Sequence, residues 1–277
     1  MNILCHDTRY GPIVYNRNDP FFSKAIETYG EWSWSEVTCW QIVIPPGSVV
    51  VSAGANIGLH VVALAQLVGK QGAVIAFEPQ RAMYHLAIAN TVLCNVDERV
   101  RLHHAALGAA VGKISVPAID YAAADNSYGG LSLRHTEVPA DAPRYDVPLI
   151  PIDALNLSRV DFIQLDIEGM EGEALKGAEQ TIRRCQPLLY IETSYVAHNR
   201  ALHEQITSMG YNAVWHLAPM VNPSNYRGNT EDLWPGTVSI SWLCAPTGVD
   251  LGALGLPPVT DPEHHGATQF VQTSEVA

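Results

Sequence analysis

The sequence predicts one α/β domain built on a mostly parallel sheet, and three observations support this fold class. Residues 48–104 alternate short apolar runs with longer stretches of helical periodicity, an order typical of βαβ units. The apolar run 49–53 leads directly into a glycine turn, as a buried parallel strand does before its crossover helix. Hydrophobic residues make up 47% of the 277 positions, so the chain can bury a core of the required size.

The individual elements follow from periodicity and from glycine and proline punctuation. The expected strands are 48–53, 73–77, 99–104, 113–117, 160–166, 187–193, 212–217 and 237–244, and the expected helices are 57–69, 80–94, 170–178 and 199–209. The last two strands follow one another without a helix, which indicates a hairpin-like pair. Leaving out the short run 113–117, we expect a Rossmann-like, seven-stranded, mostly parallel sheet with helices on both faces and one antiparallel edge strand.

Three regions lie outside this alternation. Residues 1–45 form a leader rich in aromatic side chains, and we expect it to pack on a core domain over 46–246, with a helix near 19–29. Residues 118–147 lose periodicity and predict a long loop of the kind that often serves as a lid or binding segment. Residues 247–277 are rich in Gly, Pro and Thr and predict a loosely ordered tail.

Charge and cysteine usage exclude several classes of protein. The formal net charge is −12 and no basic run occurs, whereas a nucleic-acid partner requires clustered cations. The five cysteines are scattered without a CxxC motif, as expected of reduced thiols in a cytoplasmic protein. The N-terminus resembles no signal peptide and no 18-residue apolar run exists, so we expect no membrane partner.

The first strand and the second predict a nucleotide-cofactor pocket. Gly54 and Gly58 bracket a GxxxG turn with Asn56 between them, and Glu78 closes the next strand, where a carboxylate can accept two ribose hydroxyls. GxxxG lacks the additional glycine that lets a backbone approach a pyrophosphate. The pattern therefore favours an adenosyl cofactor without a pyrophosphate, namely S-adenosylmethionine. A plain strand-turn-helix remains the alternative for the turn, and a solvated strand end for Glu78.

Three blocks of the sequence resemble the FkbM-type family of S-adenosylmethionine-dependent methyltransferases. The blocks are GANIG at 54–58 with AFEP at 76–79, DFIQLDIEGME at 161–171 running on to LKGA at 175–178, and PLLYIE at 187–192. The resemblance implies an O-methyltransferase acting on a hydroxyl of a sugar, lipid or polyketide-like small molecule. One position departs from the family: Ser52 stands where an aspartate usually helps to hold the amino end of the cofactor, and a hydroxyl cannot supply the same charge-assisted bond.

Four further positions complete the predicted cofactor site. Ser52 and Pro79 flank the two motifs, while Ala105 and Ala106 follow the third strand, where small apolar residues suit a flat adenine but are equally common in packing. His103 and His104 alternate along a strand, so they point to opposite faces and should not share a metal.

Carboxylates at strand ends are the candidates for catalysis. Methyl transfer to an alcohol needs an aligned nucleophile and a base that takes its proton. Asp166, Glu168 and Glu192 follow the fourth and fifth core strands, and crowded like charges raise carboxylate pKa values. We rank them as bases in that order; each has a structural alternative in which it orients a loop, caps a helix or is a solvated strand end. His60 and His198 are the other candidate bases.

Two other function classes stay open at this point. The chain could be an NAD-dependent oxidoreductase or a non-catalytic domain with a methyltransferase-like fold; GxxxG and the lack of a Tyr-x-x-x-Lys pair disfavour the former. The carboxylates could hold magnesium, since it prefers hard oxygen ligands, but no ligand spacing assigns a metal. We expect the leader and the loops 118–147 and 219–236 to contact the small-molecule substrate. The oligomeric state is not predicted.

Overall fold

The structure is a computed structural model that describes residues 1–123, 131–133, 142–193, 196–264 and 271–272. Half of the loop predicted at 118–147, and the end of the tail predicted at 247–277, lie outside these residues. The predicted boundaries of the core domain remain predictions.

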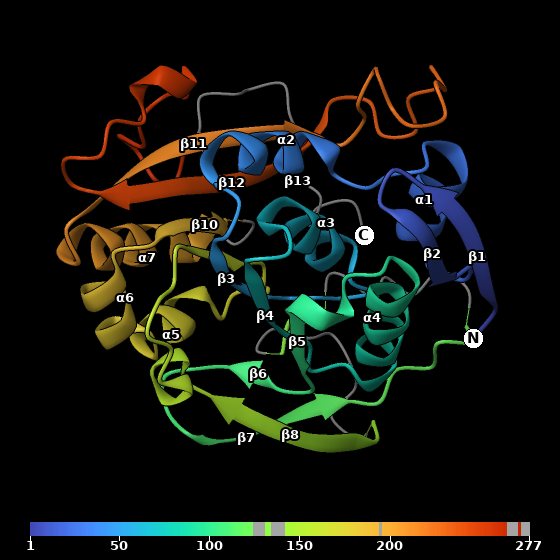
Figure 1. Cartoon of the computed structure of the whole chain (residues 1–277), viewed down its shortest axis with the longest axis horizontal. Helices are drawn as coiled ribbons and strands as arrows, with labels where there is room; N and C mark the ends of the chain where they lie inside the picture. Colours follow the sequence, from blue (N-terminus) through green and yellow to red (C-terminus); the bar gives the residue numbers. More distant parts are fainter. Residues whose placement is uncertain (124–130, 134–141, 194–195, 265–270, 273–277) are drawn as a thin grey trace.

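A central sheet crosses the whole molecule (Figure 1). Its seven main strands form one continuous path: β11 (Tyr211–Pro219), β12 (Thr237–Pro246), β10 (Leu188–Glu192), β9 (Phe162–Leu165), β3 (Val49–Ala53), β4 (Ala73–Phe77) and β5 (Val100–His103). A short strand, β13 (Val271–Gln272), pairs with the start of β12. The predicted Rossmann-like, mostly parallel sheet is confirmed.

The place of the antiparallel strand differs from the prediction. The antiparallel strand is β12, which lies between β10 and β11 and pairs antiparallel with both. The edge strand, β11, therefore runs in the same direction as β10. The hairpin was expected from the missing helix, but sequence spacing does not say which of its two strands lies next to the sheet. Strand β12 is almost fully buried. Because it lies between two strands, both of its edges are paired, which satisfies its backbone groups.

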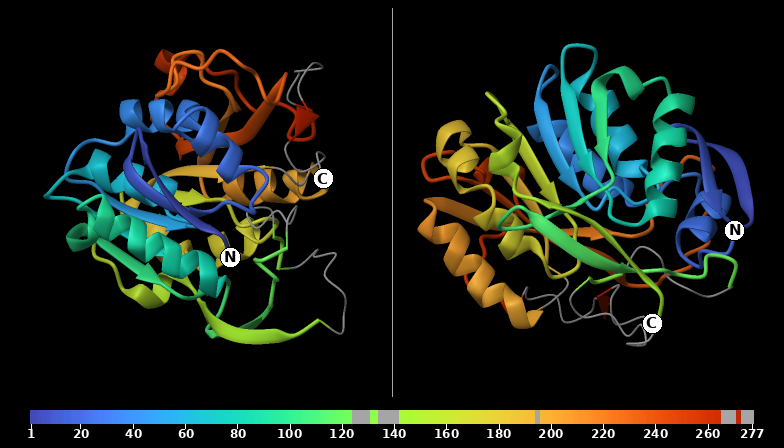
Figure 2. Two further views of the ribbon diagram at one scale, coloured as in Figure 1. Left: turned by 90° about the vertical axis from the view of Figure 1, so that its right-hand side faces the viewer. Right: turned by 90° about the horizontal axis from the view of Figure 1, so that it is seen from below.

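Helices cover both faces of the sheet (Figures 1 and 2). One apolar layer includes residues of α2 (Trp34–Val43), α3 (Leu59–Val68) and α4 (Arg81–Leu93). The other includes residues of α5 (Glu171–Lys176), α6 (Glu179–Cys185) and α7 (Val196–Ser208). Side chains alternate along the strands, so that Val50 belongs to the first layer and Val51 to the second.

The leader contains a hairpin that the sequence analysis did not specify. Strands β1 (Ile3–Thr8) and β2 (Gly11–Asn16) pair antiparallel and are followed by α1 (Phe22–Thr28), inside the helix predicted at 19–29. The hairpin lies beside α4 (Figures 1 and 2). Its buried tyrosines join the first apolar layer, so the leader is continuous with the core.

Two further predictions need correction. The segment 118–147 is not one loop, because β8 (Arg144–Ile150) begins within it and forms a separate three-stranded sheet with β6 (Ala106–Leu107) and β7 (Gly112–Pro117). The helix predicted at 170–178 is α5, which ends at Lys176, and a second short helix that was not predicted, α6, follows from Glu179. Between them Gly177 packs so closely on the chain that an added Cβ would lie 2.1 Å from the Gly108 carbonyl oxygen, and the backbone turns there.

Three 3-10 turns complete the described elements: η1 (Asp97–Arg99), η2 (Ile152–Leu155) and η3 (Gly252–Leu254). Beyond η3, Val259 is buried and its N–H donates to the Ala213 carbonyl of β11.

Across the described ranges, every helix is too short or too polar to cross a bilayer.

Candidate active site

The turn after β3 requires glycine at its first position. Gly54 has φ +85°, and a Cβ built there would lie 1.8 Å from the carbonyl oxygen of Asp166, the residue that follows β9. No side chain fits between the two strand ends. The glycine therefore brings the predicted cofactor turn directly against the first of the predicted catalytic carboxylates.

The rest of the turn is held by local hydrogen bonds. Asn56 has the positive φ (+47°) expected for it, and its Oδ1 accepts the Ile57 N–H at 2.7 Å. Gly58 has φ +90° and precedes α3; a Cβ there would lie 3.0 Å from the Ala87 Cα of α4. The turn thus presents backbone rather than side chains toward the sheet's carboxyl edge, which is where ligands bind in open α/β sheets.

Glu78 is buried and ties the two motifs together. One of its oxygens accepts the Asn56 N–H and the other accepts the Gln80 N–H, both at 2.7 Å. Burial raises its pKa to about 7, and the two N–H donors act in the opposite direction. Each carboxylate oxygen retains a second lone pair, so Glu78 can still accept hydrogen bonds from two ribose hydroxyls.

Ser52 does not extend into the turn. Its Oγ donates to Gln164 Oε1 at 2.6 Å across the β3–β9 pairing, and both side chains are buried. The hydroxyl proton is therefore used within the sheet. Sequence reasoning missed Gln164, because a partner 112 positions away leaves no local signal.

The predicted adenine side of the pocket lies around Pro79 and the end of β5. The Pro79 carbonyl lies 3.1 Å from His104 Nε2, and Ala105 and Ala106 are both buried. His103 stacks on Phe77, with 4.9 Å between ring centroids. His104 stacks instead on Tyr84 of α4, which agrees with the expectation that the two histidines do not share a metal.

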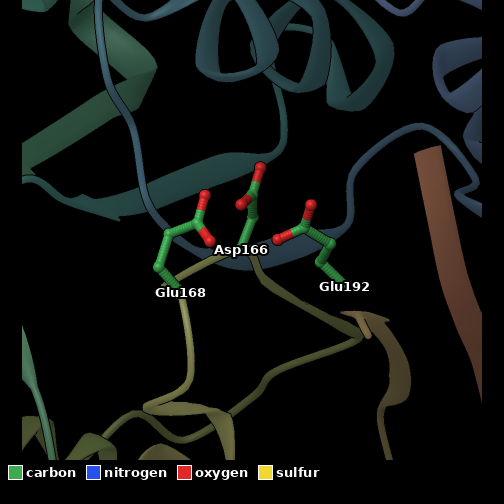
Figure 3. A group of neighbouring side chains, drawn as sticks. All are labelled: Asp166, Glu168 and Glu192. Carbon is green, nitrogen blue, oxygen red and sulfur yellow. The ribbon is translucent and has the colours of Figure 1, made fainter. Parts of the chain in front are cut away.

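The three predicted carboxylates converge (Figure 3). Asp166 follows β9, Glu192 ends β10, and Glu168 turns inward from the same loop as Asp166 with φ +52°. One carboxylate oxygen from each lies within 4.8 Å of the other two. Ser132 also reaches this loop, since its Oγ donates to the Glu168 carbonyl at 2.7 Å. The carboxyl ends of adjacent parallel strands explain this convergence.

Electrostatics at this cluster disfavour full ionisation. Burial raises the pKa of Asp166 well above its usual range, and the charges of Glu192 and Glu168 raise it further. Burial likewise raises the pKa of Glu168, followed by the charges of Glu192 and Glu171. Groups of this kind can hold or accept a proton near neutral pH. Their oxygens are also hard donors, but no further observation assigns a divalent cation.

Glu171 shapes the loop that carries Glu168. Its Oε1 accepts the N–H groups of Ile167 and Gly169, both at 3.2 Å, and burial raises its pKa to about 7. Glu171 ends the block 161–171 that resembles the FkbM family. No local pattern in that block distinguishes a glutamate that binds the backbone of a loop from one that is solvated.

The two alternative bases have different surroundings. His198 is exposed on α7. His60 is buried in the first turn of α3, with Nε2 3.5 Å from Glu36 Oε2 of the leader helix α2, and burial lowers its pKa. Glu36 also accepts hydrogen bonds from the hydroxyls of Ser33, Tyr190 and Ser239. Sequence reasoning missed Glu36, which the fold buries beneath the site.

The loop predicted at 219–236 to contact substrate begins after Pro219, the last residue of β11, and is tied to the leader. Asn222 Nδ2 donates to Glu31 Oε1 at 2.8 Å, and Arg227 Nε donates to the Ile26 carbonyl at 3.2 Å. Tyr226 is exposed and its N–H donates to Glu31. Several polar groups of this loop are therefore used in holding it to the leader.

Comparison with known proteins agrees with this architecture. The model of the methyltransferase FkbM domain matches residues 52–212. The crystal structure of a methyltransferase FkbM from Methylobacillus flagellatus KT has 21% sequence identity and a TM-score of 0.50, over 78% of this chain and 48% of that one. This chain therefore spans about half the length of that protein.

Two other solved structures are similar at lower TM-scores. An O-methyltransferase from Bacillus cereus in complex with SAH has 13% identity and a TM-score of 0.46, covering 78% of this chain and 80% of that one. The O-methyltransferase TomG from Streptomyces achromogenes, in complex with SAM, has 11% identity and a TM-score of 0.43, covering 78% and 79%. No curated protein matches closely enough to count as a relative. The family match covers more than half of the chain and includes both the turn and the carboxylates, and the chain belongs to the FkbM family of S-adenosylmethionine-dependent methyltransferases.

Proposed function

We propose that this protein transfers the methyl group of S-adenosylmethionine to a hydroxyl of a small molecule such as a sugar, lipid or polyketide-like compound. The observation that carries the proposal is the contact between the glycine turn and the carboxylate cluster. Gly54 touches Asp166, and the oxygens of Asp166, Glu168 and Glu192 lie within 4.8 Å of one another. Cofactor and base are thus at the same edge of the sheet.

In the proposed site the two motifs hold the two ends of the cofactor. Glu78 accepts the ribose hydroxyls, the backbone from Gly54 to Gly58 faces the methionine portion, and Pro79, Ala105 and Ala106 border the adenine. Ser52 stabilises the strand end that precedes the turn through its hydrogen bond to Gln164. The cofactor supplies the methyl group as an electrophile.

The reaction requires one displacement and one proton transfer. The acceptor oxygen forms a bond to the methyl carbon as the carbon–sulfur bond breaks, and its proton passes to a carboxylate. Asp166 is the first candidate for this base, followed by Glu168 and Glu192. The high pKa of Asp166 makes its ionised form a stronger base than an exposed carboxylate.

Cofactor titration tests the proposal against the two rival classes. We expect calorimetry to show binding of S-adenosylmethionine and of S-adenosylhomocysteine, and no binding of NAD. Binding of NAD alone would establish the oxidoreductase alternative. Binding of none of the three would favour the non-catalytic domain.

The base is tested by Asp166→Asn. Across a panel of hydroxylated acceptors, we expect turnover to fall by about 100-fold or more while the affinity for S-adenosylhomocysteine changes little. Glu173→Gln is the matched control, because Glu173 is paired with Lys176 on the surface of α5. Unchanged turnover in Asp166→Asn would remove the base assignment.

A cytoplasmic location without nucleic-acid or membrane partners is part of the proposal. The five cysteines are free thiols, two of them buried, as is usual in a reducing compartment. The acidic net charge of −12 supports a small-molecule acceptor over a nucleic acid.

A further inference from the structure

One side chain of α4 joins the leader hairpin to the turn after β3. Asn90 is fully buried. Its Nδ2 donates to the Ile57 carbonyl at 2.7 Å and to the Val14 carbonyl at 2.9 Å, while its Oδ1 accepts the Val14 N–H at 2.7 Å. Both amide hydrogens are used, one on each side. The side chain thus pairs with β2 as a neighbouring strand would and also fixes a carbonyl of the turn.

The same face of α4 contacts both partners along its length. Ala87, Asn90 and Cys94 are spaced by three and four residues, which places them on one side of a helix. Ala87 packs under Gly58 of the turn, and Cys94 Sγ lies 3.4 Å from the Pro12 carbonyl of the hairpin. A displacement of the hairpin would therefore be transmitted to the turn through a single rigid helix face.

A second connection reaches the other motif. Asn16, at the end of β2, donates through Nδ2 to the Tyr121 carbonyl at 2.9 Å. The hydroxyl of Tyr121 donates to Gln80 Oε1 at 3.0 Å, and the Gln80 N–H donates to Glu78. The hairpin is thus connected to both motifs proposed to hold the cofactor, at Ile57 and at Glu78.

We infer that the leader hairpin is coupled to cofactor binding and that Asn90 is the positioning residue that couples them. The inference rests on the cofactor position proposed above. Ordering the turn around a ligand fixes the Ile57 carbonyl, which fixes the Asn90 amide and with it the Val14 backbone. Coupling between two parts of a protein is reciprocal, so the ligand must stabilise the hairpin to the extent that the hairpin stabilises the ligand-bound turn.

Hydrogen exchange of the unmodified protein tests this directly. On saturation with S-adenosylhomocysteine, we expect the amides of Gly11 and of residues 13–16 to exchange at least about threefold more slowly, together with those of residues 54–58. Helix α6 packs on the other face of the sheet, and its amides should not respond. Slower exchange in the turn with no change in the hairpin would overturn the coupling and leave the proposed function intact. Absence of ligand binding would overturn both.

A pair of variants provides the second test. Asn90→Asp keeps the acceptor for the Val14 N–H but removes the amide donor to the carbonyls of Ile57 and Val14. Gln66→Glu is the control, since Gln66 Nε2 donates to the Tyr10 carbonyl at 2.6 Å and so joins α3 to the hairpin without touching the turn. We expect the Kd for S-adenosylhomocysteine to rise about tenfold in Asn90→Asp, the scale of one lost hydrogen bond, and to stay within twofold in Gln66→Glu. Equal affinities in the folded variants would refute the role of Asn90. Should Asn90→Asp not fold, the exchange measurement decides.

Discussion

Replacing Gly54 by alanine should destabilise the protein far more than the same change at another left-handed glycine. The added Cβ would lie 1.8 Å from the Asp166 carbonyl oxygen, whereas Cβ contacts under 3.0 Å are essentially never observed. Because the obstructing atom belongs to the backbone of a buried strand end, no side chain can move aside. The turn or the end of β9 must shift by more than 1 Å.

The magnitude has two parts. A positive φ costs an L-residue about 1–2 kcal/mol, and overpacking a rigid interior adds about 1–3 kcal/mol. We therefore expect a total loss of about 2–5 kcal/mol. For a chain of this size each kcal/mol corresponds to about 2–4 °C, so the Tm should fall by roughly 4–20 °C.

Gly210→Ala is the matched control. Gly210 has a similar φ of +81°, but no heavy atom lies within 4 Å of its added Cβ, so only the backbone cost applies, about 1–2 kcal/mol. Differential scanning calorimetry of both variants, with and without S-adenosylhomocysteine, measures the difference. A Tm for Gly54→Ala within about 2 °C of that for Gly210→Ala would refute the steric argument.

Three other outcomes follow from buried polar groups. Burial raises the pKa of Glu78 to about 7 from 4.5. Below pH 4.5 its neutral form therefore contributes about 3 kcal/mol to the free energy of unfolding. This contribution is lost as the pH rises to 7. Glu78→Gln should accordingly reduce the fall in Tm over this range and weaken binding of S-adenosylhomocysteine; an unchanged pH dependence would contradict this. Ser52→Ala leaves Gln164 Oε1 without its donor at 2.6 Å and should cost about 1–2 kcal/mol in urea unfolding, whereas a neutral result would show that the pair contributes little. Glu36→Leu removes the acceptor for the Tyr190 hydroxyl and two serines and should cost about 3 kcal/mol or more; a stable variant would show that the hydroxyls find other partners.

The sequence predicts that the glycine turn and Glu78 lie together, as the structure shows, because both belong to neighbouring segments of the chain. The turn from Gly54 to Gly58 and the acid at Glu78 belong to one βαβ unit, and their spacing alone places them together. Asp166 and Glu192 are also predictable, since the ends of parallel strands meet at one edge of a sheet. The structure adds the reason for the first glycine, which is the carbonyl oxygen of Asp166.

What the sequence does not reveal depends on contacts between distant segments. Ser52 pairs with Gln164 and Glu36 with Tyr190 across more than 100 positions, and a single sequence contains no signal for either. The strand β8 was missed for a different reason. It begins inside a stretch of weak periodicity and contains Pro148, which disfavours a strand assignment, and only its pairing with β7 makes it regular.

The reversed direction of β12 has a consequence for how this scaffold can diversify. Because β11 ends and β12 begins at the rim where β9 and β10 present their acids, the connection between them both leaves and rejoins the sheet on that side. Its length and composition can vary without altering any strand pairing, as is usual for surface connections that determine ligand choice. Changes in this one loop can therefore alter the rim beside the acids while the strand order of the sheet is retained.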